Sequence, residues 1–308
     1  MTIFSIVDQV LVLFLLIGIG WILSARRFVD QVGVRQMTNI LCYLVSPCLI
    51  INCFQMNFTA SAAHSFLLAA LSAVGIHLGS ALLGTALFRK KKLGERAAAM
   101  RFAVTYSNCG FMGLPLLQAV AGQMGVFLGV AYVGVFNLFN WTHGISVYRG
   151  KTGPSGLRKA VLNPNIIALA VSLVLFFNQI TLPSPLRQGI SYVSQMNTAL
   201  SMILVGTQLA GARIGKLVGS FPIWAAVFLR NLLLPFALLA VLVSAGLRGS
   251  LLMCCVVPVA CPIASYTAIF AELTGRETKV PVALVTLSTL FSMVTLPAVV
   301  AAAAAFAV

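Results

Sequence analysis

Two short segments of the sequence place proline, glycine and polar residues inside long apolar runs. The candidate binding residues of the first segment are Asn108, Gly110, Gly113 and Pro115, and those of the second are Pro262, Ser265 and Tyr266. Proline removes a backbone donor and clashes with the preceding turn, so each run is predicted to hold an interrupted helix. Backbone groups freed in an apolar environment must be bonded by protein or water, and two interrupted helices can do this by facing each other and a small aqueous pocket.

Either proline alone could be a simple kink in a helix. Two breaks at matching places, each with polar neighbours, favour a binding site where the interrupted helices cross. The N-termini of the half-helices would present partial positive charge there. The sequence therefore predicts that this crossing binds an anion.

Ionisable residues within the apolar runs are few. The chain has only five acids, namely Asp8, Asp30, Glu95, Glu272 and Glu277, and none is placed mid-run. A carboxylate proton relay or a carboxylate sodium site is therefore not favoured. Arg230 lies about nine residues into its run, roughly 14 Å deep at 1.5 Å per residue. It could pair with a substrate carboxylate or bond backbone carbonyls, and we include it in the binding site.

Other polar residues in the runs have structural interpretations. His77 and His143 are better explained as hydrogen-bonded structural histidines than as titrating groups. Asn137 and Asn140 share one helix face and could line a pocket or join helices. The seven cysteines form no metal-ligand spacing, so we expect no disulfide, no metal and no cofactor.

Composition shows which elements must position these residues. Hydrophobic residues make up 60% of the 308-residue chain and charged residues 8%, against roughly 25% charged in soluble domains. The chain is therefore predicted to be an all-α integral membrane protein. Ten apolar runs can be assigned, at residues 3–23, 36–54, 64–88, 97–120, 124–148, 160–180, 187–210, 221–246, 250–272 and 279–306.

The basic residues predict the orientation of these runs. The connections after the odd-numbered runs hold Arg26, Arg27, Arg35, Arg89, Lys90, Lys91, Lys92, Arg96, Arg101, Arg149, Lys151, Arg158, Lys159, Arg213, Lys216, Arg276 and Lys279. Outside this set lie only Arg187, Arg248 and Arg230. By the positive-inside rule the odd connections are cytoplasmic and both termini lie outside. This bias also explains the net charge of +15 without nucleic acid, which we do not expect as a partner.

The two halves of the chain match weakly. Met37-Thr38-Asn39-Ile40-Leu41 corresponds to Met196-Asn197-Thr198-Ala199-Leu200, and Gly113-Leu114-Pro115 corresponds to Ala260-Cys261-Pro262. Both interrupted runs then reach a glycine, Gly122 or Gly275. Five runs per half would invert the second repeat relative to the first. The sequence thus predicts repeats at residues 1–150 and 151–308, an arrangement that points to a secondary transporter.

Several short motifs carry a family resemblance along most of the chain. They are Ser107-Asn108, Gly113-Leu114-Pro115-Leu116-Leu117, Asn163-Pro164-Asn165, Pro47, Pro262, Phe270-Ala271-Glu272, Phe291-Ser292-Met293 and Leu296-Pro297. In their order the sequence resembles the auxin efflux carrier family, which includes plant PIN carriers and bacterial permeases, some linked to malate or malonate.

The resemblance implies a ten-helix fold of the sodium/proton antiporter and bile-acid symporter type. Runs one, two, six and seven would form a scaffold, through which a homodimer could form, and runs three to five and eight to ten a mobile transport domain. The substrate would bind at the crossing of runs four and nine, contacted by Asn108. The short connection between runs five and six lacks the long insertion of plant members.

We therefore predict a secondary transporter in the plasma membrane, the inner membrane of a bacterium. It would move a small organic anion, such as a malate-like or malonate-like carboxylate or an auxin-like weak acid, by alternating access. Proton coupling, sodium coupling as in bile-acid symporters, and uniport remain open. An integral-membrane lipid-modifying enzyme is disfavoured because no cluster of acids, metal ligands or nucleophile with base is present. A receptor and a channel also lack support.

Overall fold

The computed structural model describes residues 3–150, 154–212 and 215–306, and these residues fold almost entirely into helices. Lys151 and Arg213, two of the basic loop residues, lie outside the described ranges. The helices up to residue 150 are α1 (Ile3–Ala25), α2 (Gln31–Ile40), α3 (Ser46–Cys53), α4 (Ala60–Leu87), α5 (Lys90–Leu93), α6 (Arg96–Thr105), α7 (Leu114–Phe139) and α8 (Ile145–Arg149).

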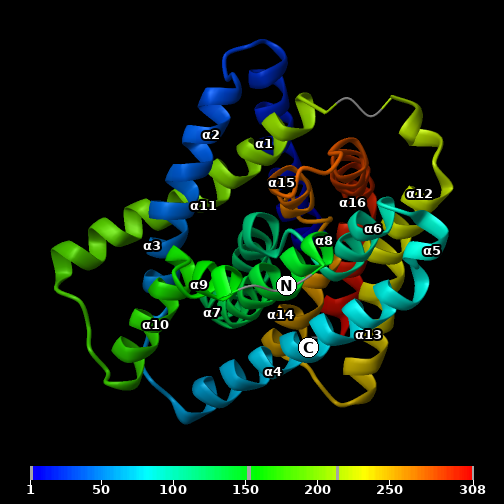
Figure 1. Cartoon of the computed structure of the whole chain (residues 1–308). Coiled ribbons are helices and arrows are strands. Elements are labelled where there is room, and N and C mark those ends of the chain that lie inside the picture. The colour runs from blue at the N-terminus through cyan, green and yellow to red at the C-terminus, as the bar shows by residue number, and fades with distance from the viewer. Residues whose placement is uncertain (1–2, 151–153, 213–214, 307–308) are drawn as a thin grey trace.

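The rest of the chain is also helical (Figure 1). Its α-helices are α9 (Pro154–Val161), α10 (Pro164–Phe177), α11 (Ser184–Ala210), α12 (Phe221–Phe228), α13 (Leu234–Ser244), α14 (Gly249–Ala260), α15 (Tyr266–Leu273) and α16 (Lys279–Ala305). A short 3₁₀ turn, η4 (Gly215–Gly219), precedes α12. An all-helical membrane protein, as predicted from composition, is therefore confirmed at the level of secondary structure.

Wide π-helical turns interrupt several of the longer helical segments. They are η1 (Leu41–Val45), η2 (Cys109–Gly113), η3 (Asn140–Gly144) and η5 (Leu229–Leu233). Three of them end two residues before a proline, namely Pro47, Pro115 and Pro235. Proline cannot donate to the carbonyl four residues earlier, and in each case that carbonyl belongs to the π turn. The prolines therefore widen these segments without ending them.

Within the described residues, six helical segments are long and apolar enough to cross a membrane. They are Asp8–Ala25, Gln31–Cys53, Ala60–Leu87, Cys109–Arg149, Phe221–Ser244 and Lys279–Ala305, and Pro164–Phe177 and Gly249–Ala260 are shorter apolar helices. The segment Cys109–Arg149 contains a non-helical residue, Gly122, with φ 60° and ψ −151°. The prediction of ten spans therefore goes beyond what the length and composition of these helices establish.

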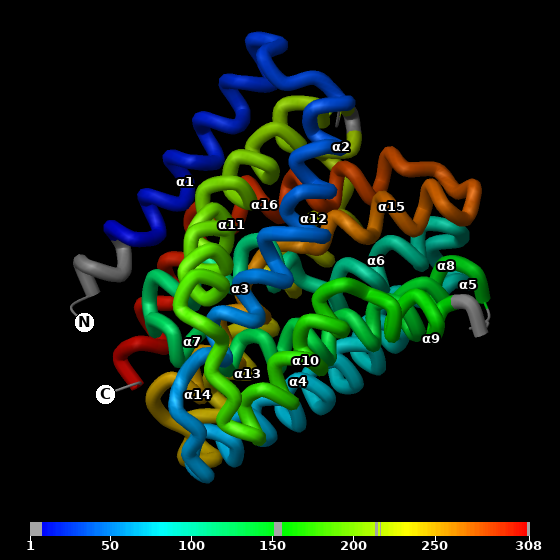
Figure 2. The backbone as a smooth tube through the Cα atoms, turned by 90° about the vertical axis from the view of Figure 1, so that its left-hand side faces the viewer, coloured from blue at the N-terminus to red at the C-terminus, as the bar shows by residue number. Residues whose placement is uncertain are grey.

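Helices α1 and α11 approach each other closely through two glycines (Figure 2). A Cβ atom at Gly206 would stand 2.0 Å from the Ile17 carbonyl oxygen, and one at Gly20 would stand 2.0 Å from the Ile203 carbonyl oxygen. Small residues let the backbones of membrane helices touch in this way. The two helices are thus joined backbone to backbone.

The helices pack as two groups, and the α1 and α11 pair belongs to the first. In one group α11 packs on α1 and α3, and α3 packs on α10. In the other, α14 packs on α7, α13 and α16, and α4 packs on α6 and α7. Figure 1 shows α3, α10 and α11 at the left of the molecule and α5, α6, α12 and α13 at the right. The π turn η2 before α7 belongs to the second group, and it contacts α11 of the first group.

The glycine contact between α1 and α11 generates a stability prediction. Gly206→Ala should lower the melting temperature of the purified protein, because the added methyl group collides with the backbone of Ile17. Overpacking of this kind costs about 1–3 kcal/mol. Gly189→Ala on the same helix is the matched control, since its Cβ would meet nothing within 4 Å. Equal melting temperatures for the two variants would contradict the contact.

Candidate functional site

Both helices carrying the proline segments are interrupted, and the interrupted stretches cross. Helix α6 ends at Thr105, and Tyr106 is extended, with φ −116° and ψ 117°. Helix α14 ends at Ala260, and Cys261 is extended, with φ −62° and ψ 148°. Pro262 lies inside its break. Pro115 lies in the first turn of α7, where a missing N–H is tolerated, so the first interruption lies upstream of it.

Backbone hydrogen bonds join the two interruptions directly. The Asn108 N–H donates to the Pro262 carbonyl at 2.7 Å, and the Ala264 N–H donates to the Tyr106 carbonyl at 3.0 Å. Between them, Ser107 and Ile263 form an isolated antiparallel bridge. Each break therefore satisfies part of the other's freed backbone, as an apolar interior requires.

A buried polar pair on neighbouring helices completes this pairing. The Ile263 N–H donates to Ser288 Oγ at 2.9 Å, and Ser288 Oγ donates to Asn231 Oδ1 at 2.7 Å. Asn231 Nδ2 in turn donates to the Ser288 carbonyl at 2.7 Å. Ser288 and Asn231 are fully buried. Helix α16 and the π turn η5 thus fix the position of the second break.

Arg230 lies beside the same crossing and is fully buried. Its Nη1 donates to the Val104 carbonyl at 3.0 Å, in the last turn of α6. A cation at a helix C-terminus is stabilised by the exposed carbonyl dipoles. Its Nε and Nη2 have no hydrogen-bond partner among the described residues. Arg230 therefore bonds a backbone carbonyl, one of the two roles considered from the sequence, and keeps two donors unused.

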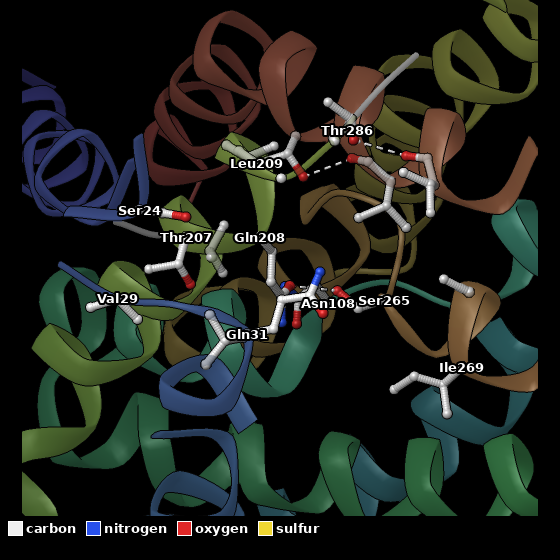
Figure 3. A pocket seen from close by; sticks show the side chains of 18 of the residues that line it. Ser24, Val29, Gln31, Asn108, Thr207, Gln208, Leu209, Ser265, Ile269 and Thr286 are labelled. Carbon is white, nitrogen blue, oxygen red and sulfur yellow. Dashed lines mark hydrogen bonds between the residues drawn. The ribbon is translucent and has the colours of Figure 1, made fainter. Parts of the chain in front are cut away.

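A cavity of about 610 Å³, which we name the Asn108 cavity, ends at the crossing (Figure 3). It is lined by Ser24, Arg27, Val29, Asp30, Gln31, Val34, Asn108, Val205, Thr207, Gln208, Leu209, Gly211, Ala212, Ser265, Ala268, Ile269, Val282, Val285, Thr286 and Thr289. Among the described residues, the charged ones that line it are Arg27 and Asp30, both exposed in the connection between α1 and α2. The deep end is thus neutral and polar.

Two of the eight predicted site residues, Asn108 and Ser265, line this cavity together. Figure 3 shows their side chains beside Gln208, whose Oε1 accepts a hydrogen bond from Ser265 Oγ at 3.0 Å. An amide and a hydroxyl from the two interruptions and a second amide from α11 therefore meet at one place. The Ser265 hydroxyl gives its one proton to Gln208, so the donors left for the oxygens of a small anion are the amide N–H groups of Asn108 and Gln208.

The other predicted residues lie near the crossing but outside the cavity lining. Gly113 packs against α14, where an added Cβ would lie 3.6 Å from Cys261 Sγ. Tyr266 stacks among Phe136, Trp141 and Phe270. The remaining four are Gly110, Pro115, Pro262 and Arg230. None of these six residues lines the Asn108 cavity, and Pro115 lines a separate cavity.

Sequence reasoning missed Gln208, Thr286 and Thr289. Thr286 and Thr289 are three residues apart on α16, and Gln208 follows Thr207 near the end of α11. Polar residues at this spacing within an apolar helix were the available signal. Threonine can bond its own helix backbone, as Thr289 Oγ1 does to the Val285 carbonyl at 2.8 Å, so the signal alone does not separate lining from structural residues.

Two further cavities lie beyond the crossing. The larger, the Arg187 cavity, has a volume of about 530 Å³ and is lined by Asn52, Gln55, Gln118, Gln123, Ser184, Arg187, Gln188 and Ser191. The smaller, the Pro115 cavity, has a volume of about 240 Å³ and is lined by Leu49, Asn52, Leu114, Pro115, Gln118, Ser194, Gln195, Asn197 and Thr198. Asn52 and Gln118 line both, so these two cavities are neighbours.

An apolar contact separates the Pro115 cavity from the Asn108 cavity. Between Asn108, which lines one, and Leu114, which lines the other, the chain forms only the π turn η2. Phe111 of this turn packs on a buried cluster of Leu41, Val45 and Leu204. The barrier between the two sides is therefore one turn of backbone and one apolar cluster.

The predicted structural histidines are hydrogen-bonded. His77 Nδ1 lies 2.7 Å from the Ala73 carbonyl, and His143 Nδ1 lies 2.8 Å from the Tyr106 hydroxyl. Asn137 and Asn140 are buried and do not line the Asn108 cavity. These contacts agree with the structural interpretation of the histidines.

Apolar helices that are interrupted at a polar crossing, with cavities on either side, are typical of a membrane transport protein. A family model described as "Membrane transport protein" matches residues 5–155 and, a second time, residues 150–300. The chain belongs to this family, which is the auxin efflux carrier family, and the resemblance noted from its motifs is confirmed. The chain is also similar to an uncharacterized transporter of Methanocaldococcus jannaschii, with 23% identity over 300 residues, covering 93% of this chain and 95% of the relative.

The polar pair beside the crossing generates a second prediction. Ser288→Ala should destabilise the protein, because it leaves the buried Ile263 N–H without its acceptor, at a cost of about 1–3 kcal/mol. The measurement is the melting temperature of the purified protein. Ser292→Ala is the control, since Ser292 is equally buried on α16 but bonds only the Thr289 carbonyl of its own helix. A loss no larger than that of Ser292→Ala would refute the assigned role.

Proposed function

We propose that the protein is a secondary transporter that moves a small organic anion, of the malonate, malate or auxin-like weak-acid class, by alternating access. The observation that carries the proposal is the Asn108 cavity, which ends on Asn108, Ser265 and Gln208 at the crossing. The amides of Asn108 and Gln208 offer hydrogen-bond donors, Ser265 orients the Gln208 amide, and none of the described acids lines the deep end. A carboxylate bound there would meet amide donors from the first interruption and from α11.

In the proposed architecture ten spans form two inverted repeats, residues 1–150 and 151–308. The double match of one family model supports the repeat. So do the positive φ angles of the two corresponding glycines, 60° at Gly122 and 67° at Gly275. In this scheme the α1, α2, α3, α10 and α11 group is the scaffold and the remaining helices are the transport domain. A homodimer would form through the scaffold helices.

The proposed orientation places the Asn108 cavity on the cytoplasmic side and the Arg187 cavity outside, in the plasma membrane. The α1–α2 connection, with Arg27, lines the Asn108 cavity. Arg276 after α15 forms an ion pair with Glu95 before α6, so two of the basic connections lie together. The described ends of α1 and α16 lie on one side of the molecule (Figure 2), which agrees with both termini being outside.

A binding screen on purified protein tests the proposal. Malonate, malate and indole-3-acetate should raise the melting temperature, whereas choline and glucose should not. The screen is run with and without sodium and at two pH values, so that the coupling ion is read from the same data. Stabilisation by choline or glucose, with none by any carboxylate, would refute an anion site.

Asn108→Ala should weaken binding of the stabilising carboxylate roughly tenfold or more, because a hydrogen bond to a charged group contributes about 1.5–3 kcal/mol. Binding is measured by titration of the purified variant. Asn178→Ala is the control, since Asn178 is exposed at the end of α10 and bonds only the Val174 carbonyl. Unchanged affinity in Asn108→Ala would exclude the crossing as the binding site.

Arg230→Ala should abolish carboxylate uptake in cells while the protein is still expressed. The substitution removes the buried positive charge beside the crossing and the bond to the Val104 carbonyl. Arg230→Lys keeps the charge and should keep part of the uptake. Uptake at the wild-type rate in Arg230→Ala would show that the charge has no part in transport.

A further inference from the structure

All eight residues that line the Arg187 cavity are polar, in a chain that is 60% hydrophobic. Arg187 is the only charged residue among them, and the others are five amides and two serines. None of the five acids of the chain lines this cavity. The described residues include no ion-pair partner for Arg187. The cavity thus offers one free guanidinium surrounded by neutral hydrogen-bonding groups.

A carboxylate fits this set of groups better than a cation or a neutral solute. Arginine presents a planar fork of donors that matches the two oxygens of a carboxylate. The amides of Gln118 and Gln123 approach from α7, opposite Arg187 on α11, so a bound molecule would contact both helices. A cation would meet repulsion from Arg187 without a compensating acid.

The cavity also leads toward the crossing along a polar face of α11. Ser184, Gln188 and Ser191 line the Arg187 cavity, and Gln195 and Thr198 line the Pro115 cavity. Their spacing of three and four residues places them on one face of the helix. Beyond them, Met202 is fully buried and Val205 lines the Asn108 cavity. One helix face therefore passes all three cavities, and the buried Met202 lies on it between the Pro115 cavity and the Asn108 cavity.

We propose that the Arg187 cavity is a second carboxylate-binding site, which holds the substrate on the side of the crossing opposite the Asn108 cavity. The inference rests on the proposed function for the class of ligand. Arg187 attracts the anion into the cavity, and the amides of α7 orient it beside the Pro115 cavity. The substrate reaches Asn108 from there only after the contact of Phe111 with its apolar cluster opens.

Thiol modification of purified protein in detergent tests the site without requiring transport. Gln188→Cys places a reporter beside Arg187, and the wild-type chain reports the background from its native cysteines. A negatively charged methanethiosulfonate should modify the reporter several-fold faster than a positively charged one, and malonate should slow the reaction. Adding Arg187→Gln should remove both effects, whereas adding Arg248→Gln, at another exposed arginine, should leave them unchanged.

Transport of malonate from each side then separates the two proposals. Arg187→Gln should raise the half-saturating malonate concentration about tenfold from the side of the Arg187 cavity and leave the opposite side unchanged. Persistence of both labelling effects in Arg187→Gln, or an equal rise from both sides, would overturn the second site. Malonate protection that depends on Arg187, in a protein that transports no carboxylate, would keep the site and refute the proposed function.

Discussion

The structure depends on one constraint, namely that backbone groups freed in an apolar interior must be bonded. Two helices break at the same place, and their extended segments bond each other through Asn108, Pro262, Tyr106 and Ala264. An unpaired backbone group in hydrocarbon costs several kcal/mol, so neither break is stable without the other. The candidate binding groups at the end of the Asn108 cavity exist because this pairing holds their backbone.

The surroundings of the crossing follow from the same constraint. The Ile263 N–H donates to Ser288 Oγ instead of to the other interrupted segment, and Arg230 donates to the Val104 carbonyl at the end of α6. These side chains come from α16 and from the turn before α13, so the crossing is held from outside by the group of helices that carries it. On its other face it meets α11, which is joined closely to α1 by glycines. In the proposed function, alternating access requires one rigid group of helices to move against another. The crossing with its supporting helices and the pair of α1 and α11 are two such groups.

Much of this could be predicted from the sequence. The proline segments located the crossing, and two of the residues predicted there, Asn108 and Ser265, line one cavity in the structure. From the sequence, Arg230 could pair with a substrate carboxylate or bond backbone carbonyls. In this conformation it bonds the Val104 carbonyl. Gln208, Thr286 and Thr289 were missed, because the sequence shows that a polar residue lies on an apolar helix but does not show which other helix its side chain contacts. The break was also expected at Pro115, whereas it lies upstream of η2.

By itself the sequence determined the membrane-protein class, the helical content and the family, together with the segments where helices break. These properties depend on composition and on local steric rules, which each residue carries whatever surrounds it. Only the tertiary structure decided that the two breaks bond each other, that Gln208 joins Ser265, and that cavities stand on both sides of η2. Those features depend on distances between residues far apart in the chain, which packing alone sets.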